Sequence, residues 1–302
     1  LLPPPLLYRN NNKLRENRIG NYKTIAKEMT LDGAMLLYQS LNYSTAKAPN
    51  ENYMRELMEL FTMGIGNYTE GDIREGAKVL TGWRIAAYKY QPAPNEAFNV
   101  YFSRNDHHKG AKRVFNIDFP AIDDSDNYEE KVKENEVFRL IDVLFQERSK
   151  AIAKFISEKI FRFFVYSSPA DVDNEIIEQM ADTFIKNEFE LLPVYKQLFT
   201  SKFFYSEAVV GAQIKTPQEF IIGIQKMFGK EFKSGNTKKS REACEALEME
   251  LYDPPNVGSW AAYRSWISTT TYPNRYKYAK EYLSLFSDKE ILDYGKKFSN
   301  YQ

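Results

Sequence analysis

The stretch that decides the fold is Pro49-Asn-Glu-Asn-Tyr-Met-Arg-Glu-Leu-Met-Glu-Leu-Phe-Thr-Met-Gly64. Its apolar residues recur every three or four positions, so they fall on one arc of a helix, while the charged residues lie opposite. Gly64 ends the pattern, because glycine readily adopts the left-handed conformation that a helix terminus often needs. The stretch therefore predicts an amphipathic helix that packs against another element.

A second helix follows after a short loop. Thr69-Glu-Gly-Asp72 has the pattern of a capping box, in which a threonine and an acidic residue three positions later cap the first turn. The helix after it places Ile73, Leu80 and Trp83 on one face. Because two amphipathic helices joined by a short loop pack antiparallel, residues 50–83 predict a helical hairpin.

The whole chain is predicted to be a mainly α-helical, multi-helix domain with a small inserted antiparallel β ribbon. Residues 1–83 form its N-terminal helical part. Residues 84–120 form the ribbon, because they contain short segments rich in β-branched and aromatic residues with turn residues between them. These segments are Arg84–Tyr90, Asn99–Arg104 and Lys112–Phe119. Residues 121–302 return to the helical period, and we expect them to pack with the first part as one domain.

The composition argues against several classes of function. The chain has 41 basic and 41 acidic residues, and this zero net charge disfavours binding to nucleic acid or to an anionic membrane surface. No apolar run approaches the roughly 18 residues that a membrane span needs. Cys244 is the single cysteine, which excludes an intramolecular disulfide, a zinc ribbon and an iron–sulfur cluster. It lies on an apolar helix stripe, so we expect an inert, buried thiol.

Asp106-His-His-Lys-Gly-Ala-Lys112 holds both histidines of the chain and lies on a loop between predicted strands. Neighbouring side chains in an extended segment point to opposite faces, so only one imidazole would face a given site. With an acidic partner, His107 would serve as a general base or as one ligand of a metal ion. The alternative is a solvated turn whose histidine packs on an aromatic ring or caps a backbone group.

Carboxylates near the start of the first helix are the candidate partners of that histidine. Glu51, Glu56 and Glu59 could converge on a metal ion or a substrate. The alternative is a well-capped surface helix, in which Asn50 caps the first turn and Arg55 forms ion pairs with acidic residues one turn away.

Two further residues are unusual for their positions. The helical angle of Arg84 places it near the apolar face of the second helix. A buried arginine needs a carboxylate partner, and the candidates are Glu56 and Asp72. Trp260 ends Asp253-Pro-Pro-Asn-Val-Gly-Ser-Trp260, a rigid, non-helical segment. Its ring would be either part of the core or a platform for a ligand.

These observations give two groups of candidate site residues. The catalytic candidates are His107, Glu51 and Glu56. The binding candidates are Asn50, Asn52, Arg55, Arg84, Lys112 and Trp260. The sequence identifies no cofactor and no set of metal ligands, although a divalent metal ion would suit the hypothesis of a hydrolytic site at His107.

Several segments resemble, in the same order, motifs of the family called domain of unknown function 1800. The stretch 49–64, Tyr68-Thr-Glu70 and Ala77–Trp83 resemble its signature. His107–Lys112 is similar to its His-Asp-x-Gly-x-Lys element, with His108 where the family usually has Asp. The later matches are Ile160–Val165, Ile214–Pro217 and Pro254–Trp260.

The resemblance implies a location and partners but no reaction. The family is bacterial and mostly exported, which implies a protein of the periplasm or the outer surface. Its genes often lie beside those of a second uncharacterised family related to sulfatases, which implies a sulfatase-related partner.

Two hypotheses about function follow. The favoured one is a non-catalytic module of the cell envelope that binds a protein or glycan partner or serves in assembly, because catalytic groups are few and aromatic residues many. The alternative is a hydrolase, metal-assisted in one version, that uses His107 and the carboxylates near residues 50–59.

Overall fold

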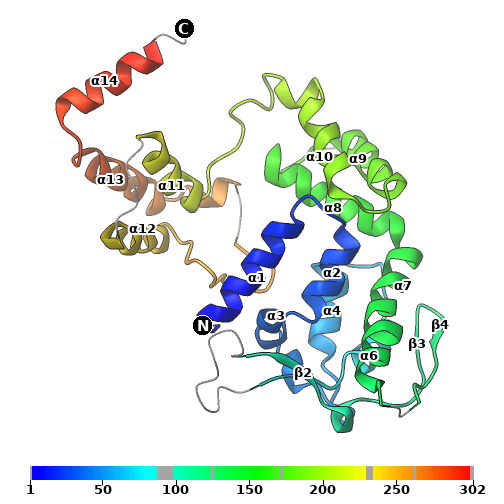
Figure 1. Cartoon of the computed structure of the whole chain (residues 1–302). Coiled ribbons are helices and arrows are strands. Elements are labelled where there is room, and N and C mark those ends of the chain that lie inside the picture. Colours follow the sequence, from blue (N-terminus) through cyan, green and yellow to red (C-terminus); the bar gives the residue numbers. More distant parts are fainter. Residues whose placement is uncertain are drawn as a thin grey trace. The chain divides into compact units, whose positions relative to one another are not determined.

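The computed structural model describes residues 2–86, 98–123, 126–166, 168–170, 173–228, 234–260 and 263–299 (Figure 1). Within these residues the protein is mainly α-helical, as the sequence predicts. The chain divides into two compact units. The larger unit comprises residues 2–161 and 169–204, and the smaller unit comprises residues 162–168 and 205–302. This division falls inside the predicted 121–302 part, and the packing of the helical parts as one domain stays a prediction.

The larger unit contains most of the helices. In chain order they are α1 (Pro4–Asn17), α2 (Tyr22–Thr30), α3 (Gly33–Tyr38), η1 (Leu41–Tyr43), α4 (Glu51–Glu59), α5 (Glu70–Val79), η2 (Arg104–Asp106), α6 (Tyr128–Val132), η3 (Lys133–Phe138), α7 (Arg139–Glu147), α8 (Ser149–Phe164), α9 (Asn174–Lys186), α10 (Leu191–Thr200) and η5 (Phe203–Tyr205). The last residues of α8 and η5 belong to the smaller unit.

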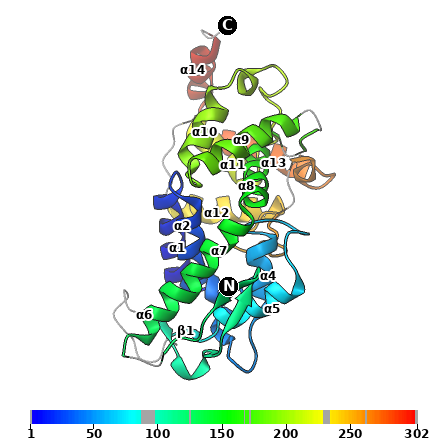
Figure 2. The same cartoon turned by 90° about the vertical axis from the view of Figure 1, so that its right-hand side faces the viewer.

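Helices α4 and α5 form the predicted hairpin and pack against each other (Figure 2). The predicted capping box of α5 is present, with both the Thr69 and Asp72 side chains bonded to backbone N–H groups. Gly76 allows the close approach of the two helices, because a Cβ atom there would lie 2.5 Å from the Cε of Met54. One part of the prediction is wrong. Because α5 ends at Val79, Trp83 lies in a strand instead of on the helix face.

Among the described residues, four short strands form two separate antiparallel pairs instead of a single ribbon. Strand β1 (Trp83–Ile85) pairs antiparallel with β2 (Val100–Phe102), and β3 (Lys112–Val114) pairs antiparallel with β4 (Ile117–Phe119). Residues 87–90 of the predicted first strand lie outside the described residues.

The predicted strand Lys112–Phe119 is therefore itself a hairpin. Its two turn residues, Phe115 and Asn116, both have a left-handed backbone, with φ of 49° and 64°. Two consecutive left-handed residues make the tight turn whose twist matches that of the strands on either side. No glycine marks this turn, so the sequence reads as one continuous strand.

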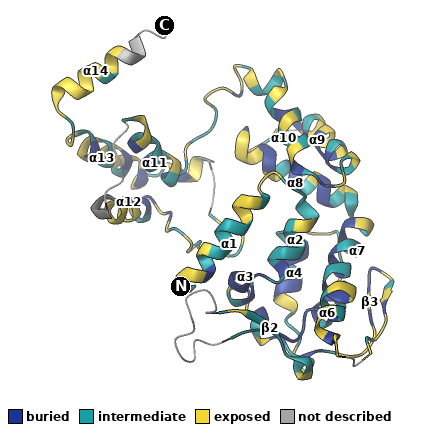
Figure 3. Ribbon diagram, in the orientation of Figure 1, coloured by how far each residue is buried: buried dark blue, intermediate teal, exposed yellow. Residues whose placement is uncertain are grey.

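Helices α6, η3 and α7 follow one another without a break, and η3 is a π-helical turn. Val137, Leu140, Ile141 and Leu144 lie in η3 and α7 and are buried; Figure 3 colours the chain by burial. A π-helical turn changes which side chains face inward, and such turns are frequent at functional sites. Here the turn contains a buried carboxylate, that of Glu136.

The smaller unit contains α11 (Pro217–Met227), α12 (Ser234–Ala246), η6 (Tyr263–Trp266), α13 (Thr271–Leu283) and α14 (Asp288–Ser299). Helix α11 begins with a capping box of Thr216 and Glu219. Cys244 packs in a small apolar cluster between α11 and α12, and burial raises the pKa of its thiol to about 11, as an inert thiol requires.

Membrane-spanning helices were not expected from the sequence. Among the helices that the structure describes, none combines the length and the apolar character that crossing a bilayer demands.

Candidate functional site

His107 lies in the larger unit beside Lys112 and Glu136, and the three residues expose 3% of their surface or less. The Lys112 Nζ atom is 2.5 Å from Oε1 of Glu136. The Nε2 atom of His107 is 3.2 Å from the other carboxylate oxygen, Oε2, and 3.5 Å from Lys112 Nζ. We call these three residues the His107 cluster.

The segment that follows α5 holds the imidazole in place. The Nδ1 atom of His107 is 2.9 Å from the carbonyl oxygen of Thr81, so Nδ1 carries a proton and donates it to that carbonyl. The hydroxyl of Thr81 accepts the backbone N–H of His108 at 2.8 Å. Gly82, with φ of 93°, allows this approach, because a Cβ atom there would lie 3.1 Å from the Cβ of His107.

Aromatic rings flank the imidazole. Its centroid is 5.4 Å from the ring of Phe102 and 6.0 Å from that of Tyr128. The guanidinium of Arg104 lies 4.9 Å from the Tyr128 ring. The alternative interpretation of the sequence is thus correct in its contacts, because His107 packs on aromatic rings and bonds a backbone group, but wrong in placing it in a solvated turn.

The chemistry of the cluster is that of a buried charge pair with a polar neighbour. Burial lowers the pKa of Lys112, and the carboxylate of Glu136 partly opposes that effect. Lys112 and Glu136 form the ion pair, and the imidazole of His107 lies beside both of them. A general base must reach a substrate proton, whereas the nitrogens of His107 already contact protein groups in the interior. This arrangement suits a structural role that ties α5, the 107–112 loop and η3 together.

The predicted carboxylates do not lie beside His107. Glu51 is exposed, and Glu56 is half-buried; burial and then the neighbouring Glu59 raise the pKa of Glu56. Among the described residues, no contact joins Glu51 or Glu56 to His107. The acidic partner is instead Glu136, which is 24 residues beyond Lys112.

The candidate binding residues at the start of α4 hold a helix junction together. The Asn50 side chain caps α4 and donates to the carbonyl of Gln39 at 2.9 Å, and Asn52 donates to the side chain of the same residue. Arg55 pairs with both carboxylate oxygens of Glu70 at 2.7 and 2.8 Å, instead of with the acidic residues one turn away on its own helix.

Arg84 has a different partner from those predicted. Its Nη2 atom is 2.9 Å from Asp106, and its Nη1 donates to the carbonyl of Ser44 at 2.8 Å. Glu56 and Asp72 are therefore not its partners. The prediction failed because Arg84 belongs to a strand, where a helical angle has no meaning. The carboxylate of Asp72 instead accepts the N–H of Phe115.

Trp260 belongs to the smaller unit and is half-buried. It lines a cavity of about 440 Å³ together with Trp266 and four acidic residues, Glu245, Glu248, Glu250 and Asp253. Trp266 is buried, so the core interpretation suits Trp266 better than Trp260.

A metal site requires ligands that converge. In the part of the chain that the structure describes, no three His, Cys, Asp or Glu side chains are grouped so that they could hold a metal ion. The residues named in the metal-assisted hypothesis therefore form no such group.

A cavity of about 1000 Å³ lies among α1, α2, α3 and η3 of the larger unit. We call it the α1 cleft. Its lining mixes apolar, amide and charged side chains of both signs: Leu6, Arg9, Asn12, Lys13, Glu16, Asn17, Thr24, Lys27, Glu28, Leu31, Asp32, Gly33, Phe98, Val100, Lys133 and Phe138.

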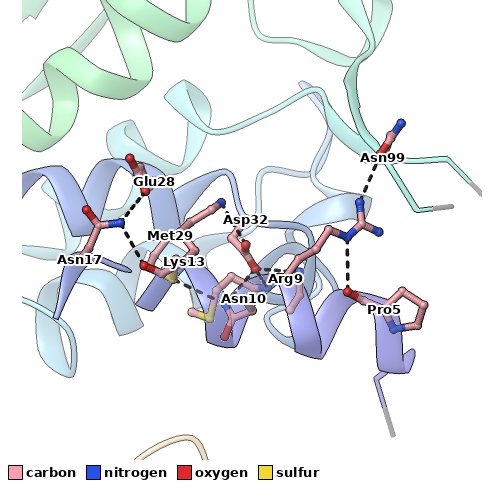
Figure 4. A network of polar contacts seen from close by, with 11 residues as sticks. Pro5, Arg9, Asn10, Lys13, Asn17, Glu28, Met29, Asp32 and Asn99 are labelled. Carbon is pink, nitrogen blue, oxygen red and sulfur yellow. Dashed lines mark hydrogen bonds and ion pairs between the residues drawn. The ribbon is translucent and has the colours of Figure 1, made fainter. Parts of the chain in front are cut away.

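Polar contacts organise the wall of this cleft (Figure 4). Lys13 forms an ion pair of 3.1 Å with the buried Asp32, which also accepts a hydrogen bond from Asn10 at 2.9 Å. Lys27 pairs with Asp142 at 2.7 Å. The half-buried Asn12 differs from these residues, because its amide has no hydrogen-bond partner among the described residues.

A family model described as "Protein of unknown function (DUF1800)" matches residues 4–299, nearly the whole chain. The chain belongs to the DUF1800 family. The resemblance of its motifs to that family is thus confirmed, while the family description names no activity. No curated protein and no solved structure matches the chain.

Two of the DUF1800 motifs meet at the His107 cluster. Segment 77–83 supplies the Thr81 carbonyl, and segment 107–112 supplies two of the three cluster residues. The third cluster residue, Glu136, was not predicted from the sequence. Its position four residues before the buried Leu140 indicated that both lie on the same face of a helix. The α1 cleft was not predicted either. The three asparagines of Arg9-Asn-Asn-Asn-Lys13 were an indication of it, because asparagine is a weak helix former and a run of three is unusual in a helix.

Proposed function

We propose that this DUF1800 chain is a non-catalytic binding module of the bacterial cell envelope and that its α1 cleft holds a glycan. The observation that carries the proposal is the cleft itself, with its paired charges and the unpartnered amide of Asn12. Location in the periplasm or on the outer surface rests on the resemblance of the motifs to exported proteins.

The size of the cleft suits a ligand of a few sugar units. Small-molecule sites typically have volumes of about 300–1000 Å³, and the α1 cleft lies at the upper end of that range. Glycan hydroxyls both donate and accept hydrogen bonds, so they can use the Asn12 amide and the lysine and glutamate side chains of the lining.

The charges of the cleft favour a glycan over a simple ion. Lys13 and Lys27 already have carboxylate partners, so neither offers an uncompensated positive charge. Glu16 and Glu28 line the same cavity and disfavour a polyanion. The apolar lining residues, among them Phe138, provide a surface for the C–H faces of sugar rings.

The position of His107 supports binding over hydrolysis. His107 is buried, and none of the residues predicted to be catalytic lines the α1 cleft. A sulfatase-related partner stays a prediction of the family resemblance, and a protein partner is the second outcome of the test below.

The test is to probe an array of bacterial envelope glycans with the full chain and with two asparagine variants. Asn12→Ala removes the amide from the cleft. Asn105→Ala is the matched control, because Asn105 is exposed on η2. We expect the wild type and Asn105→Ala to bind the same glycans, and Asn12→Ala to lose roughly tenfold in affinity if about one well-made hydrogen bond is removed.

The result that would overturn the proposal is an array without binding, or equal binding by Asn12→Ala and the wild type. Circular dichroism melting of both variants shows whether they remain folded. A chain that binds no glycan but captures one defined envelope protein would replace the glycan by a protein partner.

A further inference from the structure

The cavity of about 440 Å³ that Trp260 lines belongs to the smaller unit. The end of α12, the segment 248–260 and η6 contribute its wall. We call it the Trp260 pocket. Small-molecule sites typically have volumes of about 300–1000 Å³, so the pocket is large enough to hold a small organic ligand.

The wall of the Trp260 pocket carries negative charge that is largely uncompensated. Among the described residues, its charged side chains are all acidic: Glu245, Glu248, Glu250 and Asp253. Glu245 forms an ion pair of 3.3 Å with Arg241. The other three carboxylates have no ion pair and no hydrogen bond among the described residues. A cavity lined by charges of one sign attracts ligands of the opposite sign, so the pocket favours a cation.

The arrangement of these carboxylates does not suit a metal ion. Within the described part of the chain, no three acidic, histidine or cysteine side chains are grouped closely enough to hold one. The volume of the pocket also far exceeds that of a single ion. Separated carboxylates instead suit a ligand that carries several ammonium groups at a distance from one another, because each ammonium then meets its own acceptor.

Two tryptophans line the same pocket. Trp260 is half-buried, whereas Trp266 exposes only 6% of its surface. The indole N–H of Trp266 has no hydrogen-bond partner among the residues that the structure describes. A buried indole N–H usually has an acceptor, so a ligand that brings an oxygen atom would complete this group. Indole faces also attract ammonium groups.

An oligosaccharide of amino sugars with free amines combines the features that this wall selects. Each glucosamine unit carries one ammonium group for a carboxylate and several hydroxyl oxygens that accept hydrogen bonds. We propose that the Trp260 pocket binds such a cationic amino-sugar oligosaccharide. In this complex Glu250 and Asp253 pair with ammonium groups, Trp260 packs on the C–H face of a sugar ring, and the N–H of Trp266 donates to a hydroxyl oxygen.

This proposal does not rest on the glycan proposed for the α1 cleft. The α1 cleft belongs to the larger unit and the Trp260 pocket to the smaller one. Their described linings also differ, because basic and acidic side chains are mixed in the α1 cleft and only acidic ones carry charge in the pocket.

The experiment titrates the full chain with the glucosamine trimer and with the N-acetylglucosamine trimer by calorimetry, at low ionic strength and mildly acidic pH. The two trimers share their ring skeleton, but acetylation removes the positive charges. The pocket variant combines Glu250→Gln with Asp253→Asn, both at exposed positions. The charge-matched control combines Glu242→Gln with Glu281→Gln, which are exposed in the same unit and do not line the pocket. Trp260→Leu removes the aromatic platform.

We expect the glucosamine trimer to bind the wild type, and added salt to weaken that binding. The pocket variant should lose about tenfold in affinity, because two charge pairs are removed, and Trp260→Leu should lose about threefold. The charge-matched control should bind as the wild type does. Asn12→Ala, which alters the α1 cleft, should leave this salt-sensitive binding unchanged, so the failure of one proposal is distinguishable from the failure of the other.

The proposal fails if the glucosamine trimer does not bind, if the pocket variant binds it as tightly as the wild type, or if the charge-matched control weakens binding equally. It also fails if the pocket variant weakens the binding of both trimers to the same extent, because recognition would then not depend on the ammonium groups. Unchanged circular dichroism of each variant shows that lost binding is not lost folding.

Discussion

At the scale of single residues, the ion pair of Lys112 and Glu136 makes the strongest demand on its surroundings. Both side chains are removed from water, and their mutual attraction compensates for the lost hydration only while both are present. The imidazole of His107 and the Thr81 carbonyl extend the pair into a network that joins three segments of the chain.

Removing one member of this pair should destabilise the larger unit strongly. We expect Lys112→Met to lower the free energy of unfolding by about 3–5 kcal/mol, because it leaves the Glu136 carboxylate buried without its partner. Urea unfolding measures the change. The double variant Lys112→Met with Glu136→Leu should recover part of the loss, and the exposed Lys109→Met should change stability far less. A Lys112→Met variant as stable as the wild type would refute a structural role for the pair.

The buried Tyr53 makes the stability depend on alkaline pH. Burial raises the pKa of Tyr53 well above its usual range. Between about pH 10 and the higher pKa of the folded state, the unfolded chain has lost this proton while the folded chain keeps it. The free energy of unfolding therefore falls with rising pH, by about 1.4 kcal/mol per pH unit for this one group.

Tyr53→Phe should remove that contribution. We expect the free energy of unfolding, measured with urea between pH 10 and 11.5, to fall less steeply with rising pH for Tyr53→Phe than for the wild type. The difference between the two slopes should correspond to about one proton. The exposed Tyr43→Phe is the matched control. Parallel pH profiles for the wild type and Tyr53→Phe would show that Tyr53 ionises equally in both states.

Residue partners were the least predictable feature. The expectation that only one of the two neighbouring histidines faces the site followed from local geometry, since adjacent side chains in an extended segment point to opposite faces. The partner Glu136 did not, because a contact across 29 residues depends on the packing of the 128–147 helical run onto the loop. Arg84 was misassigned for a similar reason. The helical angle of the preceding helix was extended to Arg84, although this residue begins the predicted strand, and this gave the wrong face and hence the wrong carboxylates.

At the scale of elements, local signals predicted the structure well. The capping boxes at Thr69 and Thr216 are both present, because such a cap depends only on residues within one turn. The hairpin of β3 and β4 was missed, because its turn uses Phe115 and Asn116 instead of the glycine that usually signals a left-handed backbone.

The cap of α5 also holds the β3–β4 hairpin, so its two residues should differ in importance. Thr69→Ala removes part of the cap and should cost about 1 kcal/mol. Asp72→Ala removes its part of the cap together with the 2.7 Å hydrogen bond from the N–H of Phe115. We expect this variant to lower the free energy of unfolding by about 2–3 kcal/mol. Chemical denaturation of the two variants gives the comparison. Equal losses would mean that the bond to the hairpin contributes nothing.

At the scale of the whole molecule, the chain divides into two compact units, and the His107 cluster and the α1 cleft both belong to the larger one. The sequence predicted the mainly helical class, because helical periodicity recurs along the chain. It could not predict the cavities, because a cavity depends on how side chains from several helices fit together.

The measurement that tests the central proposal most directly is hydrogen–deuterium exchange of the full chain with and without soluble muropeptides, which are glycan fragments of the bacterial envelope. We expect slower exchange in residues 4–33 and 133–138, which form the α1 cleft, no change in residues 107–114, and muropeptides of unchanged mass after the incubation. Exchange that is unchanged in the cleft, or cleaved muropeptides together with protection around His107, would contradict a non-catalytic glycan-binding module.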